Sequence, residues 1–370
     1  GHIDSEWGSC ANPAYLYGNV AGGEWFDWYY ESEEGAQSQR RIPILDGDEQ
    51  EHWVFRSKDI RGWWENIHAE RIGSDRRSTS WSPGLKPIWF TECGCPAVAY
   101  GTNQPNAFVD YRSSESMLPR GSNGMRDDFI QMQYFGVLAD FWNRAENNPI
   151  SGSYGGRMVD MTHAFAWAWD ARPFPAFPTQ GVLWADGRNY ELGHWLNGRS
   201  ASECTENVVR ELVQGLVPSL AEIDVPYIVR GFGLDDLSTV RSRIQPLALA
   251  YGFDVIERNG VVSMRRRTGD DTLEIAGGTQ AVEAELGGNI EYCTAGAAQD
   301  SRTIVAGYLR DQGSFEAAAA QSLQSPDLTG GTARTEIPLL LTAQEARVLV
   351  ERWHAETSLA RESVKLALPL

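Results

Sequence analysis

The stretch Pro87–Pro96, PIWFTECGCP, decides the fold class of the first half of the chain. It forms a short apolar run that reaches Glu92 and then breaks at once into glycine and proline. Runs of this kind, bounded by such residues, are typical of buried strands. A carboxylate at the end of a strand is where (β/α)8 barrel enzymes hold their catalytic groups. The stretch therefore predicts a barrel strand, with Glu92 as a candidate catalytic residue.

The segments around this strand alternate between helical and strand patterns. Residues 1–57 have no clear period and predict long loops with at most one short helix. The order that follows is a run of βα units, about the last quarter to third of a barrel that needs about 250 residues. The predicted elements are a helix at 58–68, a strand at 88–92, a helix at 127–144, a strand at 157–169 and a helix at 190–196.

The composition changes near residue 199. Thirteen of the 14 tryptophans lie at or before Trp195, and only Trp353 follows. Stretches rich in glycine, alanine, glutamine and serine replace the aromatic ones. We therefore place a domain boundary there and expect one domain at 1–198 and a second at 199–370.

Patterns in the second half predict an α+β domain. Ser200–Glu203 and Thr342–Glu345 are capping boxes that each open a helix. Asn259 and Gly260, between two apolar runs, give the strongest short hairpin signal. The remaining predicted elements are a helix at 237–250, strands at 303–309 and 314–321 around the turn Asp311–Gly313, and a half-buried final strand at 364–370.

Charge and composition limit the partners. The 370 residues are 42% apolar and carry 32 basic against 50 acidic side chains, a net charge of −18. This charge argues against tight nucleic-acid binding and against an anionic membrane surface, and favours neutral glycans or other proteins. No apolar run approaches the ~18 residues of a membrane span. The start, Gly1–Glu6, resembles neither a signal peptide nor an initiator methionine, so we expect the sequence to begin within a longer protein.

The five cysteines do not predict a metal site. They lack the paired C-x-x-C spacing of zinc ligands, and Cys93-x-Cys95 is too tightly spaced for a zinc knuckle. We expect free structural thiols, no metal and no cofactor.

Glu92 has two interpretations. Beside the apolar Trp89 and Phe90, its charged form would be disfavoured by desolvation, as in glycosidases that keep one carboxyl group as an acid and another as a nucleophile. Alternatively, it is a strand-end glutamate that pairs with an arginine.

Residues His163–Asp170, HAFAWAWD, alternate large and small side chains. In a strand, His163, Trp167 and Trp169 would share one face with Phe165 and form an aromatic wall on which sugar rings can stack. The alternative is an aromatic face that packs in the core. The sugar-binding hypothesis is safest for Trp169, at the end of the strand.

A second aromatic cluster, residues 25–30 with Trp28 at its centre, follows a glycine-rich turn. It is either a carbohydrate platform or a packing cluster. The sequence does not separate the two.

Seven short motifs follow one another within residues 1–198. They are NVAGGE at 19–24, DWYY at 27–30, KDI at 58–60, KPIWFTE at 86–92, GCPA at 94–97, NQPN at 103–106 and SSES at 113–116. Together they resemble the TIM-barrel-like domain of the large tail-tip protein of gene transfer agents, phage-like particles that deliver host DNA. The resemblance implies the C-terminal part of a glycosidase-like (β/α)8 barrel.

Residues 200–370 are more loosely similar to the tail-hub region that follows that domain, of the baseplate hub and host-specificity type. The similarity rests on VPYI at 225–228, the Asn259–Gly260 hairpin, residues 304–320, and the helix around Trp353 leading to LALP at 366–369. It implies a β-rich hub domain that forms a ring of three identical chains. This ring would contact other tail and baseplate proteins.

The barrel domain also resembles glycoside hydrolases whose nucleophile is a glutamate at the end of the seventh strand, which falls on Glu92 here. In those enzymes the acid/base glutamate ends the fourth strand, which we expect to precede this sequence, so no acid partner is named. Cys93 departs from the apolar residue expected after that glutamate. Asn103 would line the site.

These observations favour a tail-tip component of a phage-like particle, assembled in the bacterial cytoplasm and released, whose barrel binds or cleaves cell-envelope glycans. Glu92 would be catalytic, with Trp169, Trp167, His163, Asn103 and Trp28 binding the glycan. The alternative is a stand-alone retaining glycoside hydrolase or glycan-binding protein with an accessory domain. A third hypothesis is a barrel that only packs or binds a receptor.

Overall fold

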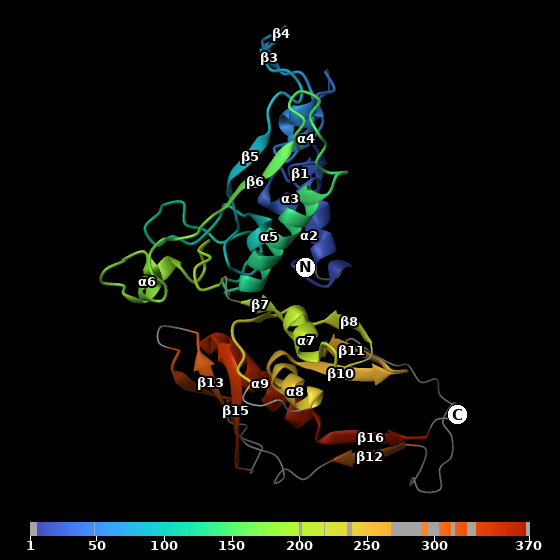
Figure 1. Ribbon diagram of the computed structural model, residues 1–370, viewed down its shortest axis with the longest axis vertical. Coiled ribbons are helices and arrows are strands. Elements are labelled where there is room, and N and C mark those ends of the chain that lie inside the picture. Colours follow the sequence, from blue (N-terminus) through green and yellow to red (C-terminus); the bar gives the residue numbers. More distant parts are fainter. Residues whose placement is uncertain are drawn as a thin grey trace. The chain divides into compact units, whose positions relative to one another are not determined.

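The computed structural model describes residues 6–47, 49–199, 202–217, 219–234, 239–267, 290–294, 303–311, 315–323 and 331–367. The chain divides into two compact units (Figure 1). The first unit comprises Gly1–Arg172 with Gln180–Asn197, and the second comprises Pro173–Thr179 with Gly198–Leu370. Among the described residues, no helix combines the length and the apolar character needed to cross a membrane.

A βαβ arrangement lies in the middle of the first unit. Strand β5 (Ile88–Cys93) and strand β6 (Val159–Ala166) are parallel neighbours, and the chain between them includes helix α5 (Asp128–Asn143) (Figure 1). The Asp127 side chain caps this helix by accepting a hydrogen bond from the Ile130 N–H at 3.0 Å. The helix expected at 127–144 and the strand expected at 88–92 are confirmed.

The sheet is not closed into a barrel. The described strands form two- and three-stranded sheets only, and β5 pairs with β6 alone. Strand β5 is therefore not the buried strand that its apolar sequence predicted, since Trp89 keeps 51% of its surface exposed and Glu92 is also exposed. Parallel strands are normally covered on both faces. Here the face that carries Trp89 is left largely exposed.

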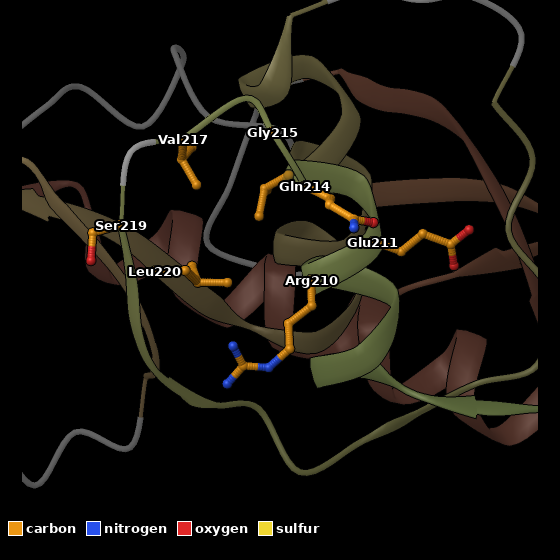
Figure 2. Close-up of a pocket in the computed structure, with 8 residues that line it drawn as sticks. Arg210, Glu211, Gln214, Gly215, Val217, Ser219 and Leu220 are labelled. Carbon is orange, nitrogen blue, oxygen red and sulfur yellow. The ribbon is translucent and has the colours of Figure 1, made fainter.

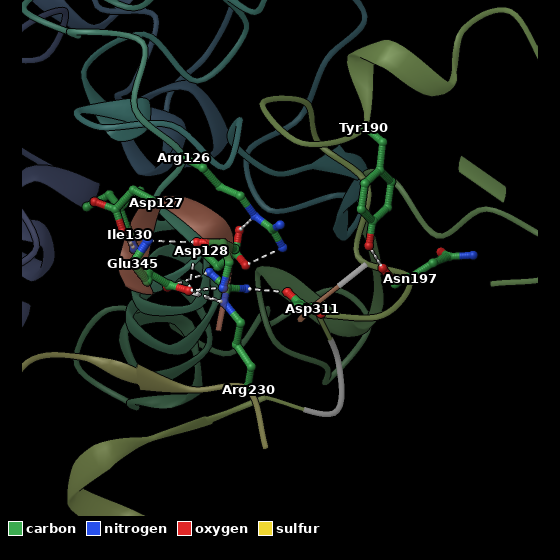
Figure 3. Close-up of polar contacts among 10 residues, drawn as sticks. Arg126, Asp127, Asp128, Ile130, Tyr190, Asn197, Arg230, Asp311 and Glu345 are labelled. Atoms are coloured by element: carbon green, nitrogen blue, oxygen red, sulfur yellow. Dashed lines mark hydrogen bonds and ion pairs between the residues drawn. The ribbon is translucent and has the colours of Figure 1, made fainter. Parts of the chain in front are cut away.

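Two apolar clusters hold the first unit together. One joins helix α2 (Pro13–Val20) to α5 through Leu16, Ile130 and Val137. The other brings Trp64 of helix α4 (Ile60–Glu65) against the end of α5 and the start of β6. An ion pair between Arg126 and the buried Asp128, at 2.9 Å, stabilises the first turn of α5 (Figure 3).

The loops of the first unit contain more structure than the sequence predicted. Helix α2 begins after Asn12, whose side chain accepts from two backbone N–H groups, and helix α3 (Glu33–Gln37) begins after Ser32, whose hydroxyl accepts from the Gly35 N–H. The expectation of at most one helix in residues 1–57 was wrong because these caps act locally without a long apolar period. The other short elements are β1 (Trp28–Tyr29), β2 (Ile42–Pro43), η1 (His52–Phe55), β3 (Ala69–Ile72), β4 (Asp75–Ser78), η2 (Gly101–Asn103) and η3 (Gly187–Asn189).

Two predicted elements of the first half have different bounds, and a third is absent. Helix α4 ends at Glu65, so Ile67 lies outside it and is exposed. Strand β6 ends at Ala166 rather than at 169. The helix expected at 190–196 is absent, since the described residues there follow the 3-10 helix η3 as turns.

The second unit is a mixed α/β fold with two three-stranded sheets. In one, β13 (Thr303–Arg310) lies between β14 (Ala317–Gln321) and β15 (Thr332–Leu341). In the other, β11 (Val261–Arg266) lies between β8 (Leu220–Asp224) and β10 (Phe253–Arg258). The other elements are α6 (Ala176–Thr179), β7 (Glu203–Cys204), α7 (Thr205–Val213), β9 (Ile228–Val229), α8 (Val240–Tyr251), β12 (Ile290–Thr294), α9 (Ala343–Leu359) and β16 (Glu362–Leu366).

One apolar core joins the helices of this unit to its strands. Leu247 of α8, Met264 of β11, Leu339 of β15 and Leu349 of α9 are all buried in it. Arg230 is buried at its margin between Glu345, at the start of α9, and Asp311, which follows β13; its closest approaches to these carboxylates are 3.0 and 3.4 Å (Figure 3). This arginine ties three segments of the unit to one another.

Local signals in the second half are largely confirmed. Asn259 and Gly260 have φ values of 54° and 75° and join β10 to β11 in the expected hairpin. Thr342 and Glu345 form the predicted capping box of α9. The described parts of the helix expected at 237–250 and of the strands expected at 303–309 and 314–321 correspond to α8, β13 and β14.

Other predictions for this half are wrong or concern residues outside the described ranges. Helix α7 begins at Thr205 with Cys204 at its N-cap, so Glu203 closes no capping box there. Strand β16 ends at Leu366 and is mostly exposed instead of half-buried, because β12 is its one partner among the described strands. Ser200, Leu237, the turn at 312–313 and residues 368–370 lie outside the described residues.

Candidate functional site

A cleft of about 800 Å³ opens in the first unit beside the end of β5. It brings together three of the residues predicted from sequence: Glu92, Trp28 and Asn103. These come from β5, β1 and η2, segments that are distant in the sequence. Its lining also includes Glu6, Glu24, Trp25, Tyr30, Arg41, Lys58 and Arg120.

Glu92 stands at the exposed end of β5, where the chain turns sharply. The Trp167 N–H donates to the Cys93 carbonyl at 2.7 Å, which fixes this end of the strand against the chain leaving β6. A Cβ at Gly94 would lie 2.2 Å from the Trp167 carbonyl oxygen, so only glycine permits this approach. Partial burial raises the pKa of the neighbouring Cys93 thiol, which donates to the Phe165 carbonyl at 3.3 Å.

Aromatic rings form another part of the cleft. The rings of Trp28 and Tyr30 lie with centroids 4.9 Å apart. The Arg41 guanidinium lies over Trp28 at 4.6 Å from the ring centroid, and that of Arg120 lies over Tyr30 at 5.5 Å. Cations in this position are attracted by the ring quadrupole. The residue 25–30 cluster is thus a half-buried surface inside a cleft, with Trp25 exposed.

Asn103 acts on the cleft through Arg120. Its side-chain amide donates to the Arg120 carbonyl at 2.8 Å, and the Gln104 side chain accepts from the Arg120 N–H at 2.8 Å. Arg120 in turn donates from one nitrogen to both oxygens of Glu24, at 3.0 and 3.1 Å. Glu24 is therefore a cleft carboxylate that is already paired with a cation.

Lys58 is the third cation of the cleft. Its ammonium donates to the Gly22 carbonyl at 2.7 Å. Desolvation lowers the pKa of Lys58 to about 8, against the attraction of Glu24 and Asp27. The turn that it contacts requires glycine, since a Cβ at Gly22 would lie 2.4 Å from the Gly18 carbonyl oxygen and Gly23 has a φ of 72°.

The other three predicted site residues lie outside the lining of this cleft. The His163 ring stacks on Trp89, with centroids 4.0 Å apart and planes 6° from parallel, and its Nδ1 is 2.7 Å from Asp160. Trp167 and Trp169 follow the end of β6 and are 48% and 64% exposed. The strand alternation that would have aligned all three on one face ends at Ala166.

Trp169 precedes a network of hydrogen bonds and ion pairs, called here the polar clamp, which consists of Asp170, Arg172, Asp186 and Trp195. Asp170 accepts hydrogen bonds from Arg172 and from the Trp195 indole N–H, the latter at 2.9 Å, and Arg172 also pairs with Asp186 at 2.8 Å. The Arg172 hydrogen bonds lower the pKa of Asp170 to about 2. The clamp fixes the backbone next to the exposed tryptophans.

A smaller pocket, of about 470 Å³, lies in the second unit between the end of α7 and β8 (Figure 2). Among the described residues, its charged lining residues are Arg210 and Glu211, and Arg210 pairs with Glu206 at 2.6 Å. Among the described residues, no cluster of three histidine, cysteine or acidic side chains has the arrangement of a metal site. The cleft of the first unit is therefore the stronger candidate.

Sequence reasoning missed the charged half of the cleft. Glu24 and Lys58 stood within quoted motifs but had no assigned role, and Arg120 was not singled out. No local pattern joins Glu24 to Arg120 or Lys58 to Gly22, because these contacts form only when distant segments fold together.

Comparisons with known proteins assign both halves of the chain. Residues 1–178 match the family described as "GTA TIM-barrel-like domain", and residues 239–370 match the family described as "Putative phage tail protein". Among solved structures, a chain of the "Virion of native gene transfer agent (GTA) particle" is 33% identical, with a TM-score of 0.45. The match covers 54% of this chain and 45% of that one, so this chain spans less than half of its relative's length.

No curated protein matches the chain. The two family matches lie in different parts of the sequence and follow one another in order. The chain therefore carries a GTA TIM-barrel-like domain over residues 1–178, followed by a phage tail protein domain over residues 239–370.

Proposed function

We propose that the protein is a tail component of a phage-like gene transfer agent particle whose first unit binds cell-envelope glycans in the cleft beside β5. The observation that carries the glycan-binding proposal is the meeting of Glu92, Trp28 and Asn103 in one cleft. Indole faces suit sugar rings, and amide and carboxylate groups suit their hydroxyls. The order of a TIM-barrel-like domain and a phage tail domain supports the place in a particle.

If the site is hydrolytic, Glu92 attacks the anomeric carbon in a retaining mechanism. Its exposed position at the end of β5 gives a ligand in the cleft access to the carboxylate. The bond to the leaving oxygen breaks with a proton from an acid partner, and water then cleaves the glycosyl ester. Glu24 is a poor acid partner because Arg120 holds its carboxylate in an ion pair. The exposed Trp169 and Trp167, with the half-buried His163, then offer a further aromatic surface for a long glycan.

We also infer that β5, α5 and β6 are a fragment of a glycosidase-like barrel, with the domain boundary at 198/199. The parallel pairing of β5 and β6, connected through α5, supports this, since a (β/α)8 barrel is built from such units. The second domain is proposed to form a trimeric ring at the tail tip with other tail and baseplate proteins, in particles assembled in the bacterial cytoplasm and released.

The catalytic test measures reducing ends released from peptidoglycan and capsule by the full chain and by its Glu92→Gln variant. A hydrolase loses about a thousandfold or more of its activity in this variant, since the nucleophile is removed. Glu70→Gln, in an exposed strand outside the cleft, is the matched control and keeps full activity. Release that Glu92→Gln leaves unchanged contradicts the catalytic role.

Binding without turnover is the second candidate, favoured by the ion-paired state of Glu24. It predicts glycan binding with no reducing ends released by the wild-type chain. The mass of the protein in solution separates a ring component from a stand-alone hydrolase: a trimer supports the ring, and a monomer under all conditions contradicts it. Tight, salt-sensitive DNA binding would contradict the expected lack of a nucleic-acid partner.

A further inference from the structure

The cleft combines cationic and acidic side chains. Arg41, Lys58 and Arg120 line it together with Glu6, Glu24 and Glu92. Glu24 compensates Arg120 directly, with both oxygens within 3.1 Å. Arg120 is therefore compensated within the cleft.

Lys58 is the cation whose bonding is least complete. An ammonium group has three N–H donors, and among the described residues the only acceptor within hydrogen-bond distance of Nζ is the Gly22 carbonyl. Lys58 forms no ion pair within 4 Å in the described part of the chain, and Glu24 and Asp27 act on it only at longer range. Keeping a partly buried cation without a paired carboxylate is costly, and an anion entering the cleft would offset that cost.

We propose that the cleft takes an acidic glycan, with the carboxylate of a uronic-type sugar bound by Lys58 and a sugar ring against Trp28. This inference rests on the proposed glycan site and names its substrate class. A sugar carboxylate adds a single negative charge, which the Lys58 ammonium can balance. A densely charged polyanion would be repelled by Glu92 and by the acidic surface of the chain.

The hydrogen bond from Lys58 to the Gly22 carbonyl also suggests that this lysine has a purely structural role. This alternative can be tested. The turn has a second internal support, because the Gly23 N–H donates to Asp27 at 3.0 Å. Removing the ammonium should therefore leave the turn in place. A structural lysine would affect all ligands equally, whereas a carboxylate-binding lysine discriminates between acidic and neutral sugars.

The experiment measures binding of the full chain to oligogalacturonates methyl-esterified at all but one carboxyl group, to the fully esterified oligomers, and to an array of acidic and neutral envelope glycans with the same esterification control. The wild-type chain should bind acidic glycans about tenfold more tightly than the esters, the gain expected of one charge-assisted hydrogen bond. Lys58→Gln should lose this preference and keep binding to the esters. Lys58→Arg should retain the preference, and the exposed Lys86→Gln is the matched control that leaves it unchanged.

The comparison of acids with esters uses the wild-type chain and needs no variant. The proposal therefore remains testable even if Lys58→Gln does not fold. Equal binding of acids and esters, or a preference that survives in Lys58→Gln, overturns the acidic-ligand proposal and leaves the glycan site intact. Absence of binding to every glycan on the array overturns the glycan site, and the acidic ligand with it.

Discussion

The two units bury their apolar side chains in different ways. In the second unit one core runs through α7, α8, α9 and the strands of both three-stranded sheets. In the first unit two smaller clusters flank α5, and many large aromatic residues, including Trp89 and Trp169, remain exposed. A continuous core favours one rigid, cooperative unit. Small clusters joined by polar clamps leave surface free for a cleft, which suits a recognition unit attached to a scaffold.

The largest expected effect is on the buried arginine of the second unit. Arg230→Ala leaves Glu345 and Asp311 without their cation and should destabilise that unit by about 3–5 kcal/mol. Urea unfolding followed by circular dichroism measures it. Arg210→Ala, which breaks an exposed pair, should change stability by less than about 1 kcal/mol. Similar losses in the two variants would contradict the role assigned to Arg230.

Matched core truncations test whether the two units unfold separately. Ile130→Ala in the first unit and Leu349→Ala in the second each remove a buried aliphatic side chain and should cost about 2–5 kcal/mol. Trp353 is the single tryptophan of the second unit, so tryptophan fluorescence reports mainly on the first. Only Ile130→Ala should shift the fluorescence transition substantially. Equal shifts in both variants would show that the units unfold as one.

Acid should weaken the first unit through the Asp170 clamp. Because Arg172 lowers the pKa of Asp170 to about 2, the carboxylate stabilises the fold fully above its unfolded pKa. This contribution, about 1–2 kcal/mol, is lost as the pH falls from about 4 towards 2. Stability of wild-type and Asp170→Asn proteins across this range provides the measurement. The difference between them should shrink on acidification, and a constant difference would contradict the assignment.

The smallest expected change in stability separates the two aromatic surfaces. Trp169→Ala removes a largely exposed ring and should alter unfolding by less than about 0.5 kcal/mol. Its effect on the affinity for short glycans should be smaller than that of Trp28→Ala, since only Trp28 lines the cleft. Calorimetric titration of both variants measures this. A larger loss in Trp169→Ala would move the sugar platform from the cleft to the loop after β6.

Elements with complete local signals could be predicted from sequence. Helix α5 has a continuous apolar face and an acidic cap, the Asn259–Gly260 turn supplies the positive φ values of a hairpin, and Thr342 with Glu345 makes a reciprocal cap. In each case the decisive interactions lie within a few residues. Helices α2 and α3 carry caps as well, but the aromatic and glycine-rich sequence around them hides the helical period.

The candidate site was predictable only in part. Glu92 was found because a strand-end carboxylate is a local pattern, and Trp28 because aromatic clusters are visible in sequence. The alternation after His163 predicted a longer strand, although β6 ends at Ala166 and leaves Trp167 and Trp169 in a loop. Pairing with β5 and the backbone contact at Cys93 set that end, and neither is visible in the alternation.

The sequence by itself determined the strand that carries Glu92, the change of composition near residue 199, and the excess of negative charge. Tertiary structure alone decided that β5 keeps one side exposed, and that Glu92 shares a cleft with Trp28 and Asn103. It also placed Lys58 and the Arg120–Glu24 pair in that cleft. The physical reason is range: caps, turns and periodic faces form between near neighbours, whereas a cleft forms from segments that meet only when the whole unit folds.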